Sequence, residues 1–308
     1  MRVLVTGANG FLGSTTATAL EVRGHTPISA TRNKWHGAIE VGSVDGRTDW
    51  SKALTSCDVV IHTAARVHQM QDHATDRLNE FRKVNTEGTL QLARQASKAH
   101  IRRLIFLSTI KVHGEEHRKP CCQNDALSSQ DPYGISKMEA EQGLRQIAAE
   151  TGMEVVIVRP PLVYGPGVKA NFASMMRAVQ RGIPLPLASV THNRRSFVAL
   201  DNLVDLLITC IDHPAAANQT FLVSDGEDLS TADLLRRLGL AMNKPARLLP
   251  VPPSLLQLGA NLLGKGDMAQ RLLGNLQVDI SHTRNTLNWS PPLSVDEGLR
   301  RAVAGLAP

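Results

Sequence analysis

The chain has 308 residues, of which 42% are hydrophobic and 20% charged, and its formal net charge is +6. A chain of this length and apolar content can bury one large core or two coupled ones, which excludes a disordered protein. The basic residues are scattered and no aromatic stacking motif accompanies them, so we expect an anionic small molecule as the partner and no nucleic acid.

The cysteines argue against metal and disulfide chemistry. There are four, without CxxC spacing or a matching histidine pattern, at Cys57, Cys121, Cys122 and Cys210. We therefore expect no metal site and no structural disulfide. We interpret the adjacent pair, Cys121 and Cys122, as loop residues rather than as acid/base groups.

The sequence predicts a cytoplasmic protein with no membrane span. Residues 1–5 run directly into a glycine turn, without the apolar segment of a signal peptide. The longest apolar stretch, residues 255–276, is interrupted by Asn261, Lys265, Asp267 and Arg271, so it cannot span a bilayer. We expect an amphipathic helix that covers a core or a substrate cleft there, in preference to a membrane-surface helix.

The first half of the chain alternates short β-branched runs with longer helical patterns. Strands are expected at residues 3–6, 26–30, 59–63, 104–108 and 155–159, and helices at 12–23, 81–98 and 136–150. This alternation is typical of a parallel sheet. With right-handed crossovers, the elements form an α/β fold with a doubly wound parallel sheet.

The chain changes character after Pro160, where proline and glycine cluster through residue 167. We place a domain boundary there. Residues 1–165 are expected to form the sheet domain, rejoined by about 194–226 through strands at 197–200 and 219–224. Residues 166–193 and 227–308 then form a smaller, mixed domain that ends in helices after Ser230.

A glycine turn follows the first strand and opens the first helix. Its glycines let the backbone approach a pyrophosphate, and the helix amino terminus supplies amide donors and a positive dipole end. This context favours a dinucleotide site over a mere tight turn, although the Gly-x-x-Gly-x-x-Gly spacing differs from the usual Gly-x-Gly-x-x-Gly. The residues expected to bind the cofactor here are Gly7, Asn9, Gly10, Phe11, Leu12 and Gly13.

The residues after the second strand bear on the choice of cofactor. The run Thr31-Arg32-Asn33-Lys34 has no carboxylate that would bind the free ribose hydroxyls of NAD. A guanidinium pairs with a phosphate, so Arg32 predicts a preference for NADP(H), with NAD still possible. The alternative is that Arg32 is an ordinary surface charge.

The candidate catalytic group combines a phenol, an ammonium and a hydroxyl. Tyr133 and Lys137 stand four residues apart at the start of an expected helix, hence on one face. With the lysine charge and a nicotinamide both close, we expect the pKa of the phenol to fall, so that Tyr133 exchanges a proton with a sugar hydroxyl or carbonyl near neutral pH. The strand at 104–108 delivers Ser108 and Thr109 at its carboxyl end, where ligands bind in open α/β sheets.

A Tyr-x-x-x-Lys pair alone is common on helix surfaces, but its place after the glycine turn and the Ser-Thr strand end is specific. In this order and spacing the chain resembles the extended short-chain dehydrogenase/reductase family over nearly its whole length. Further matching segments are residues 58–65, residues 84–89, Arg159-Pro160 and residues 288–291. The resemblance implies a Rossmann-type dinucleotide-binding domain, a nucleotide-sugar-binding second domain, and a homodimer through the helices that contain Asn85 and Tyr133.

The same resemblance implies roles for single residues. Thr109, counted back from Val112-His113-Gly114, takes the catalytic Ser/Thr position, and Tyr133 is the acid or base. Lys137 holds the nicotinamide ribose and tunes Tyr133. Gly42-Ser43 stands where members often carry Gly-Asp, which leaves adenine only a backbone contact. The further residues of the cofactor site are Val44, Ala64, Ala65, Asn85, Ser108 and Pro160. Of these, Val44 contributes its backbone, Asn85 steadies the active-site backbone, and Ser108 has a structural role.

The substrate residues also follow from the resemblance. The segment 194–201 is similar to the family's Arg-Asp-Tyr-Ile-His-Val, which implies that Arg195 meets the diphosphate. Leu187 then lies against uracil, Asn171 reaches the sugar or the diphosphate, and Thr109 and Tyr133 face the reacting oxygen. For His68, Arg66 and Lys111, contact with the sugar and a surface role are both open.

Three reactions share such a scaffold: epimerisation at sugar carbon 4, 4,6-dehydration, and reduction of a 4-keto sugar. Dehydratases place Asp-Glu directly after the catalytic threonine, whereas this chain has Ile110-Lys111, which disfavours dehydration. The segments 110–114 and 160–172 resemble the bacterial O-antigen and capsule subgroup, which includes reductases of UDP-2-acetamido-2,6-dideoxy-4-hexulose.

The argument from Arg32 for an exchangeable NADPH favours reduction. The sequence therefore predicts NADPH-dependent reduction of a UDP-linked N-acetylated 6-deoxyhexulose, giving a product of the quinovosamine or fucosamine type. The alternative is a UDP-hexose 4-epimerase with retained NAD. A non-catalytic nucleotide-sugar sensor is disfavoured, because Thr109, Tyr133 and Lys137 are all present.

Overall fold

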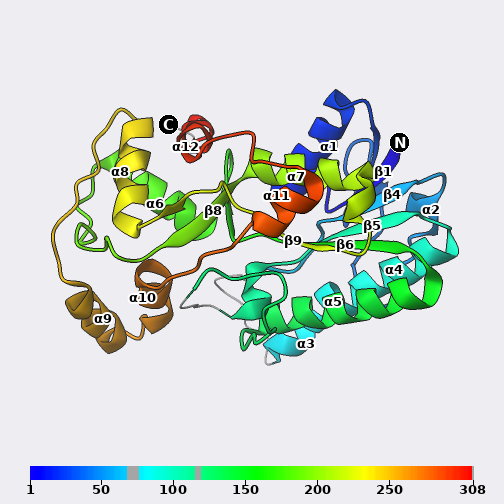
Figure 1. The fold of residues 1–308 in the computed structure, drawn as a ribbon, viewed down its shortest axis with the longest axis horizontal. Helices are drawn as coiled ribbons and strands as arrows, with labels where there is room; N and C mark the ends of the chain where they lie inside the picture. The colour runs from blue at the N-terminus through cyan, green and yellow to red at the C-terminus, as the bar shows by residue number, and fades with distance from the viewer. Residues whose placement is uncertain (68–75, 115–118, 307–308) are drawn as a thin grey trace.

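The larger part of the molecule is built on a parallel sheet (Figure 1). The structure is a computed structural model that describes residues 1–67, 76–114 and 119–306, without the side chains of residues 267 and 268. Seven strands pair in the order β3-β2-β1-β4-β5-β6-β9. They are β1 (Arg2–Thr6), β2 (Thr26–Thr31), β3 (Ile39–Glu40), β4 (Val59–His62), β5 (Arg103–Leu107), β6 (Glu154–Arg159) and β9 (Thr220–Leu222).

The strand order reverses between β1 and β4, where the chain crosses from one side of β1 to the other. Thr6 of β1 pairs with His62 of β4, so the carboxyl ends of these two strands lie together. Ligands of open α/β sheets bind at such a switch point. The fold therefore places the glycine turn after β1 where a dinucleotide site is expected.

Helices cover both faces of this sheet (Figure 1), with α1 and α7 on one face and α4 and α5 on the other. Val3 and Val5 join the apolar core under α1 and α7, while Leu4 joins the core under α4 and α5. This alternation follows from the two-residue period of a strand. The helices of this domain are α1 (Phe11–Val22), α2 (Ser51–Leu54), α3 (Arg77–Phe81), α4 (Thr89–Lys98), α5 (Pro132–Thr151), α7 (Leu200–Asp212) and α11 (Ser281–Leu287).

The five strands and three helices expected in the first half are confirmed, with one difference. The helix expected at 81–98 is divided into α3, a π-helical stretch η1 (Arg82–Gly88) and α4. Two short 3-10 turns, η2 (Ile110–His113) and η3 (Pro214–Ala216), also occur. The two-residue strand β3 was not expected, because so short a strand has no periodic pattern.

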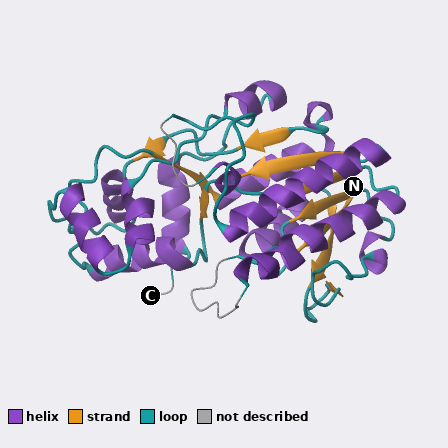
Figure 2. Ribbon diagram, turned by 90° about the horizontal axis from the view of Figure 1, so that it is seen from below, coloured by secondary structure: helices purple, strands orange, loops and turns teal. Residues whose placement is uncertain are grey.

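A second, smaller group of elements lies at the other end of the molecule (Figure 2). Its sheet has the order β10-β8-β7, formed by β7 (Leu162–Tyr164), β8 (Arg195–Ala199) and β10 (Asp228–Leu229). Its helices are α6 (Ala170–Arg181), α8 (Thr231–Ala241), α9 (Pro253–Leu262), α10 (Gly266–Leu273) and α12 (Val295–Ala304). Phe172, Leu235 and Leu299 meet in its core.

The strand expected at 197–200 does not return to the main sheet. Only β9 does so, whereas β8 pairs with β7 in the small sheet, in parallel from Leu162 and Phe197 to Tyr164 and Ala199. The physical reason is that β7 begins three residues after β6 ends, beyond Pro160 and Pro161, and offers β8 a new edge. The division into domains at residue 165 stays a prediction.

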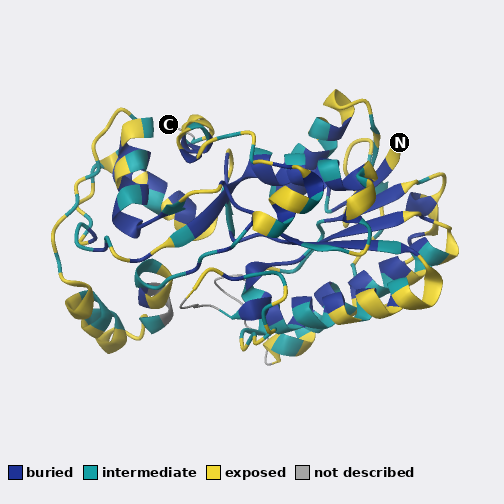
Figure 3. Ribbon diagram, in the orientation of Figure 1, coloured by how far each residue is buried: buried dark blue, intermediate teal, exposed yellow. Residues whose placement is uncertain are grey.

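The apolar stretch 255–276 forms two short helices, α9 and α10, and not one covering helix. None of the residues of α9 is buried, and Leu255, Leu258 and Leu262 are exposed (Figure 3). Leu256 and Leu273 do pack against the core of the small group. Within the described residues, no helix is both long and apolar enough to cross a membrane.

Candidate active site

The turn between β1 and α1 is shaped by backbone contacts that only glycine allows. The amide of Gly10 donates to the carbonyl of Gly7 at 2.8 Å, and a Cβ atom on Gly13 would lie 2.2 Å from the same oxygen. The first turn of α1 therefore packs against the backbone that leaves β1. Its N-cap residue is Gly10, so no side chain caps the amides of this turn. Amide donors at a bare helix terminus fit a pyrophosphate.

The residues expected to bind the cofactor here take different positions around this turn. Asn9 and Gly10 are exposed, Phe11 is half-buried, and the side chain of Leu12 is buried in the core. Leu12 therefore offers a ligand only its backbone. The cradle fits a dinucleotide, whose phosphates the backbone of Gly7 to Gly13 would hold.

A chain of hydroxyl and imidazole contacts ties β1 to β4 beside this turn. The Thr6 hydroxyl lies 2.7 Å from His62 Nδ1, and His62 Nε2 lies 2.9 Å from the Thr89 hydroxyl. Burial, with the charge of Lys137 as a second cause, lowers the pKa of His62 to about 3, so this imidazole is neutral. The amide of Ala64 donates to the Thr6 hydroxyl at 3.2 Å, which fixes the start of the segment that holds Ala64 and Ala65.

The first turn of α5 carries Tyr133 and lies against η2, the turn that follows Thr109. A Cβ atom on Gly134 would come within 3.0 Å of the carbonyl oxygen of Lys111, so this close contact requires glycine. Lys111 also binds Asp131, the N-cap of α5, with Nζ 3.4 Å from Oδ2. The sequence left open whether Lys111 contacts the sugar, and the structure shows it joining η2 to α5.

The buried ammonium of Lys137 points to the carboxyl end of β5. Its Nζ donates to the carbonyl of Leu107 at 2.8 Å and lies 4.4 Å from the centre of the Phe106 ring. Leu107 precedes Ser108 and Thr109, so the α5 pair and the strand end meet as expected. The Tyr133 ring packs edge-on against Phe81, with 5.9 Å between the ring centres.

The lowering of the Tyr133 pKa, expected with a nicotinamide beside the phenol, stays a prediction, and the pKa in the cofactor-free site is shifted the other way. Burial of the phenol, and then the charge of Asp131, raise its pKa above the usual range. Burial also lowers the pKa of Lys137 to about 7, against an upward effect of Glu141. The lysine charge is thus itself weakened by desolvation, and its ammonium is directed to a backbone carbonyl.

Asn85, on the π-helical stretch, holds the loop after β4 against α5. Its Nδ2 donates to the carbonyl of Arg66 at 3.0 Å and to the Ser136 hydroxyl at 3.0 Å, and its Oδ1 accepts from the Arg66 amide at 2.8 Å. Ser136 in turn donates to the carbonyl of Tyr133 at 2.7 Å. Asn85 is fully buried, and the steadying role expected for it stays a prediction. π-Helical turns within α-helices are often found at functional sites.

Ser108 and Thr109 are adjacent but differ in their partners. The Ser108 hydroxyl donates to Glu141 Oε1 at 2.5 Å, whereas the Thr109 hydroxyl accepts from the Lys111 amide at 3.3 Å. Thr109 is 8% exposed. Pro160, at the end of β6, accepts from the Ile110 amide at 3.0 Å. The structure therefore brings together Thr109, Tyr133, Lys137, Ser108 and Pro160.

The remaining predicted residues lie farther from this group in the fold. Arg32 is exposed after β2 and Val44 is half-buried after β3. Asn171 is exposed in the first turn of α6, and the side chain of Leu187 packs into the core of the small group of elements. Arg195 begins β8 and donates to the carbonyl of Gly274 at 3.2 Å.

Other candidate groups are settled more simply. His68 lies outside the described residues. Cys121 is buried and forms an isolated β-bridge with Val278, and Cys122 donates its amide to Asp125 at 2.8 Å. Over the part of the chain that the structure describes, no three His, Cys, Asp or Glu side chains gather in a way that could hold a metal ion.

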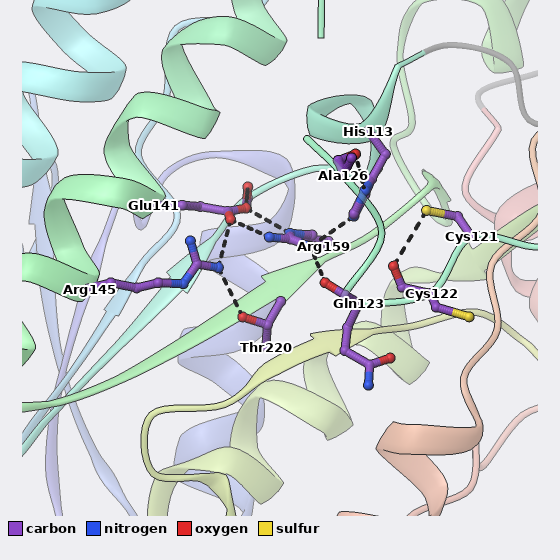
Figure 4. Close-up of polar contacts among 10 residues, drawn as sticks. His113, Cys121, Cys122, Gln123, Ala126, Glu141, Arg145, Arg159 and Thr220 are labelled. Carbon is purple, nitrogen blue, oxygen red and sulfur yellow. Dashed lines mark hydrogen bonds and ion pairs between the residues drawn. The ribbon is translucent and has the colours of Figure 1, made fainter. Parts of the chain in front are cut away.

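Sequence reasoning missed two buried partners of the site, His62 and Glu141. Glu141 follows Lys137 by four residues on α5, so its place on the Tyr133–Lys137 stripe was available as a signal. It is fully buried and binds Arg159 (Figure 4). His62 stands in the matched segment 58–65, but nothing in that segment distinguishes a ligand from a core residue.

Comparisons with known proteins agree with this fold. Residues 3–224 match the NAD dependent epimerase/dehydratase family. A UDP-glucose 4-epimerase from Vibrio cholerae is 49% identical over 97% of this chain and 93% of its own length. An N-acetyl-alpha-D-glucosaminyl-diphospho-ditrans,octacis-undecaprenol 4-epimerase from Escherichia coli O157:H7 is 26% identical over 82% of this chain and 77% of its length.

Among solved structures, a UDP-glucuronic acid 4-epimerase from Bacillus cereus in complex with NAD superposes with a TM-score of 0.80. It shares 20% identity and covers 99% of this chain and 98% of its own. The doubly wound sheet, the glycine cradle and the Thr109, Tyr133 and Lys137 group define a dinucleotide-dependent enzyme of the extended short-chain dehydrogenase/reductase class. The chain belongs to the NAD dependent epimerase/dehydratase family.

Proposed function

We propose that the protein is a UDP-hexose 4-epimerase, which inverts the hydroxyl at sugar carbon 4 with a dinucleotide that stays bound. The observation that carries the proposal is the 49% identity with the Vibrio cholerae UDP-glucose 4-epimerase over 97% of this chain. Both relatives named above are 4-epimerases, which favours this reaction over the 4-keto reduction expected from the sequence.

Three side chains, those of Tyr133, Thr109 and Lys137, have separate roles in this reaction. Tyr133 removes the proton of the 4-hydroxyl in the first half of the cycle and returns it to the 4-keto oxygen in the second. Thr109 holds the same oxygen through its hydroxyl. A bound nicotinamide would supply the acceptor, and then the donor, of the hydride at carbon 4, and the positive charge of its oxidised form would favour the phenolate of Tyr133. Because one phenol serves both epimers, a second base is not needed.

Lys137 has a binding role in this proposal. Its ammonium, which donates to the Leu107 carbonyl at 2.8 Å in the cofactor-free site, would hold the hydroxyls of the nicotinamide ribose of a bound dinucleotide. In that position it also favours the charged form of Tyr133, which counters the effect of burial on the phenol's pKa.

We propose NAD as the retained dinucleotide. A preference for NADP(H) rests on Arg32 alone, and Arg32 is not the only charge at the end of β2. Thr31 pairs in parallel register with Glu40 of β3, so a carboxylate and a guanidinium both stand near the end of this strand. A carboxylate there disfavours an additional phosphate.

The substrate side rests on Arg195, whose guanidinium is suited to a diphosphate, and on Asn171. The buried side chain of Leu187 leaves only the backbone of this segment to face uracil. A homodimer through the helices that contain Asn85 and Tyr133 is also proposed, and a mass measurement in solution tests it.

The test uses purified protein without added dinucleotide. The substrates are UDP-glucose, UDP-galactose and their N-acetylated counterparts, each with deuterium at carbon 4. We expect the epimer to form with the deuterium still on carbon 4, because the hydride leaves and returns within one active site. The denatured protein should release its dinucleotide, which chromatography identifies as NAD or NADP.

The opposite outcome is equally specific. If none of the UDP-hexoses is epimerised, and a UDP-linked 4-keto-6-deoxy sugar instead consumes added NADPH stoichiometrically, the protein is a reductase. A substoichiometric, unlabelled product would also contradict hydride return.

A further inference from the structure

Glu141 is held by a set of hydrogen bonds that the proposed reaction does not use (Figure 4). Its carboxylate accepts from Arg159 Nε at 2.9 Å and Nη2 at 2.5 Å, from the Ser108 hydroxyl at 2.5 Å, and from Arg145 Nη2 at 3.1 Å. The side chains of Glu141 and Arg159 are 0% and 2% exposed. A bidentate pair this well satisfied has a fixed geometry.

Arg159 extends this network to the segment that follows Thr109. Its Nη1 lies 2.8 Å from His113 Nε2 and donates to the carbonyl of Gln123 at 2.9 Å. An arginine can only donate, so His113 Nε2 accepts, and its Nδ1 then donates to the carbonyl of Ala126 at 3.2 Å. One guanidinium therefore fixes η2 and the loop beyond it relative to the end of β6.

The residues directly before and after Thr109 in the chain are both held by hydrogen bonds. Ser108, the residue before it, is bonded to Glu141 on α5, and the amide of Ile110, the residue after it, donates to Pro160 at 3.0 Å. Glu141 lies four residues beyond Lys137 and eight beyond Tyr133 on α5, so the three share one side of the helix. The network thus joins the strand that carries Thr109 to the helix that carries the other two catalytic groups.

We propose that Glu141 and Arg159 are positioning residues, whose buried ion pair holds Thr109 in place relative to Tyr133 and Lys137. This inference rests on the proposed function, because its readout is the rate of epimerisation. A displacement of about 1 Å between catalytic groups can lower a rate about 100-fold, so such an anchor has a kinetic consequence beyond folding.

Glu141 has an electrostatic effect on the same group. It raises the pKa of Lys137, against the larger downward effect of burial. His62 on β4 also senses the charge of Lys137, Tyr133 precedes Lys137 by one turn on α5, and Arg159 of β6 binds Glu141. His62 is neutral, so it does not compensate for a lost carboxylate.

The test replaces the carboxylate by an amide of the same shape, in Glu141→Gln. We expect kcat to fall about 10- to 100-fold with the KM for the UDP-hexose within a factor of about three, because positioning acts on the transition state. The alkaline limb of the kcat profile should also move to lower pH, since Lys137 loses a neighbour that favours its protonated form. A purely structural residue would leave that limb in place.

Two further variants make the result decisive. Glu150→Gln is the matched control, because it makes the same change at an exposed site on α5, and it should keep wild-type kcat and pH profile. Ser108→Ala keeps the ion pair but removes the bond to the strand end, so it should lower kcat without moving the alkaline limb. If Glu141→Gln does not fold, the kcat of Ser108→Ala tests the proposal in its place.

The proposal is overturned if Glu141→Gln folds and keeps wild-type kcat and pH profile. If Glu141→Gln does not fold, wild-type kcat in Ser108→Ala overturns the proposal. Hydrogen exchange separates this failure from failure of the proposed function. If the wild-type protein does not epimerise any UDP-hexose, faster exchange of amides 108–114 in the folded variants, and not in Glu150→Gln, still shows that Glu141 anchors this segment. Unchanged exchange there overturns the anchor itself.

Discussion

Replacing Tyr133 by phenylalanine separates proton transfer from folding. The ring packs against Phe81 at 5.9 Å between centres, and phenylalanine keeps that contact. The variant loses only the phenolic hydroxyl, which the proposed reaction uses in both half-cycles. We expect kcat to fall about 10²- to 10⁴-fold, which corresponds to about 3–5 kcal/mol of lost transition-state stabilisation. The retained dinucleotide and the melting temperature should change little.

The chain offers a matched control, because it has only two tyrosines. Tyr164 donates to Asp225 Oδ2 at 2.7 Å in the core of the smaller group of elements. Tyr164→Phe removes a buried hydrogen bond to a carboxylate, worth about 1.5–3 kcal/mol. Asp225 keeps its bonds from the Ala199 amide and from Asn202, both at 2.7 Å, which limits the damage. This variant should melt at a lower temperature and keep a near-wild-type kcat.

The assay follows UDP-galactose conversion through a coupled UDP-glucose dehydrogenase, with dinucleotide content and thermal melting measured on the same samples. The two variants should give opposite patterns, one with lost turnover and the other with lost stability. A Tyr133→Phe protein that retains a tenth or more of wild-type kcat would refute the role of the phenol. If Tyr164→Phe loses turnover as severely at a temperature where it is folded, the effect is not specific to Tyr133.

Three further substitutions test the cofactor site. Gly13→Ala forces a Cβ atom to within 2.2 Å of the Gly7 carbonyl oxygen. We therefore expect the free energy of unfolding to fall by about 1–3 kcal/mol and the retained dinucleotide to be lost. The control is Gly259→Ala, which has open space around it and should be neutral or stabilising. Arg32→Asp should lower NADP affinity relative to NAD about tenfold or more, as measured by titration, and an unchanged ratio would remove Arg32 from the site. Lys137 has a folded pKa of about 7, so between about pH 7 and 10 the unfolded chain binds more protons and the free energy of unfolding should rise with pH. In cofactor-free Lys137→Met this rise should be absent, and parallel stability curves for the two proteins would contradict the shift.

The sequence by itself determined the strands and helices of the first half and predicted the glycine turn and the Tyr133 and Lys137 pair. Gly13 is required by its contact with the carbonyl oxygen of Gly7 in the same turn, Gly7 itself has a positive φ of 67°, and Tyr133 and Lys137 share a helix face by their spacing alone. Such features are local, so period and spacing are sufficient to predict them. The strands of the first half were predictable for the same reason, since each is a buried β-branched run.

Tertiary structure decided what depends on contacts between distant segments. The pairing of β8 with β7 depends on which sheet edge is free, and the burial of Leu187 depends on helices that follow it in the chain. The raised pKa of Tyr133 in the cofactor-free site also depends on tertiary structure, because desolvation acts only once the helix is packed. The Glu141–Arg159 pair joins residues 18 positions apart on a helix and a strand. Its anchoring of Thr109 could not be read from spacing, because it arises where three elements meet.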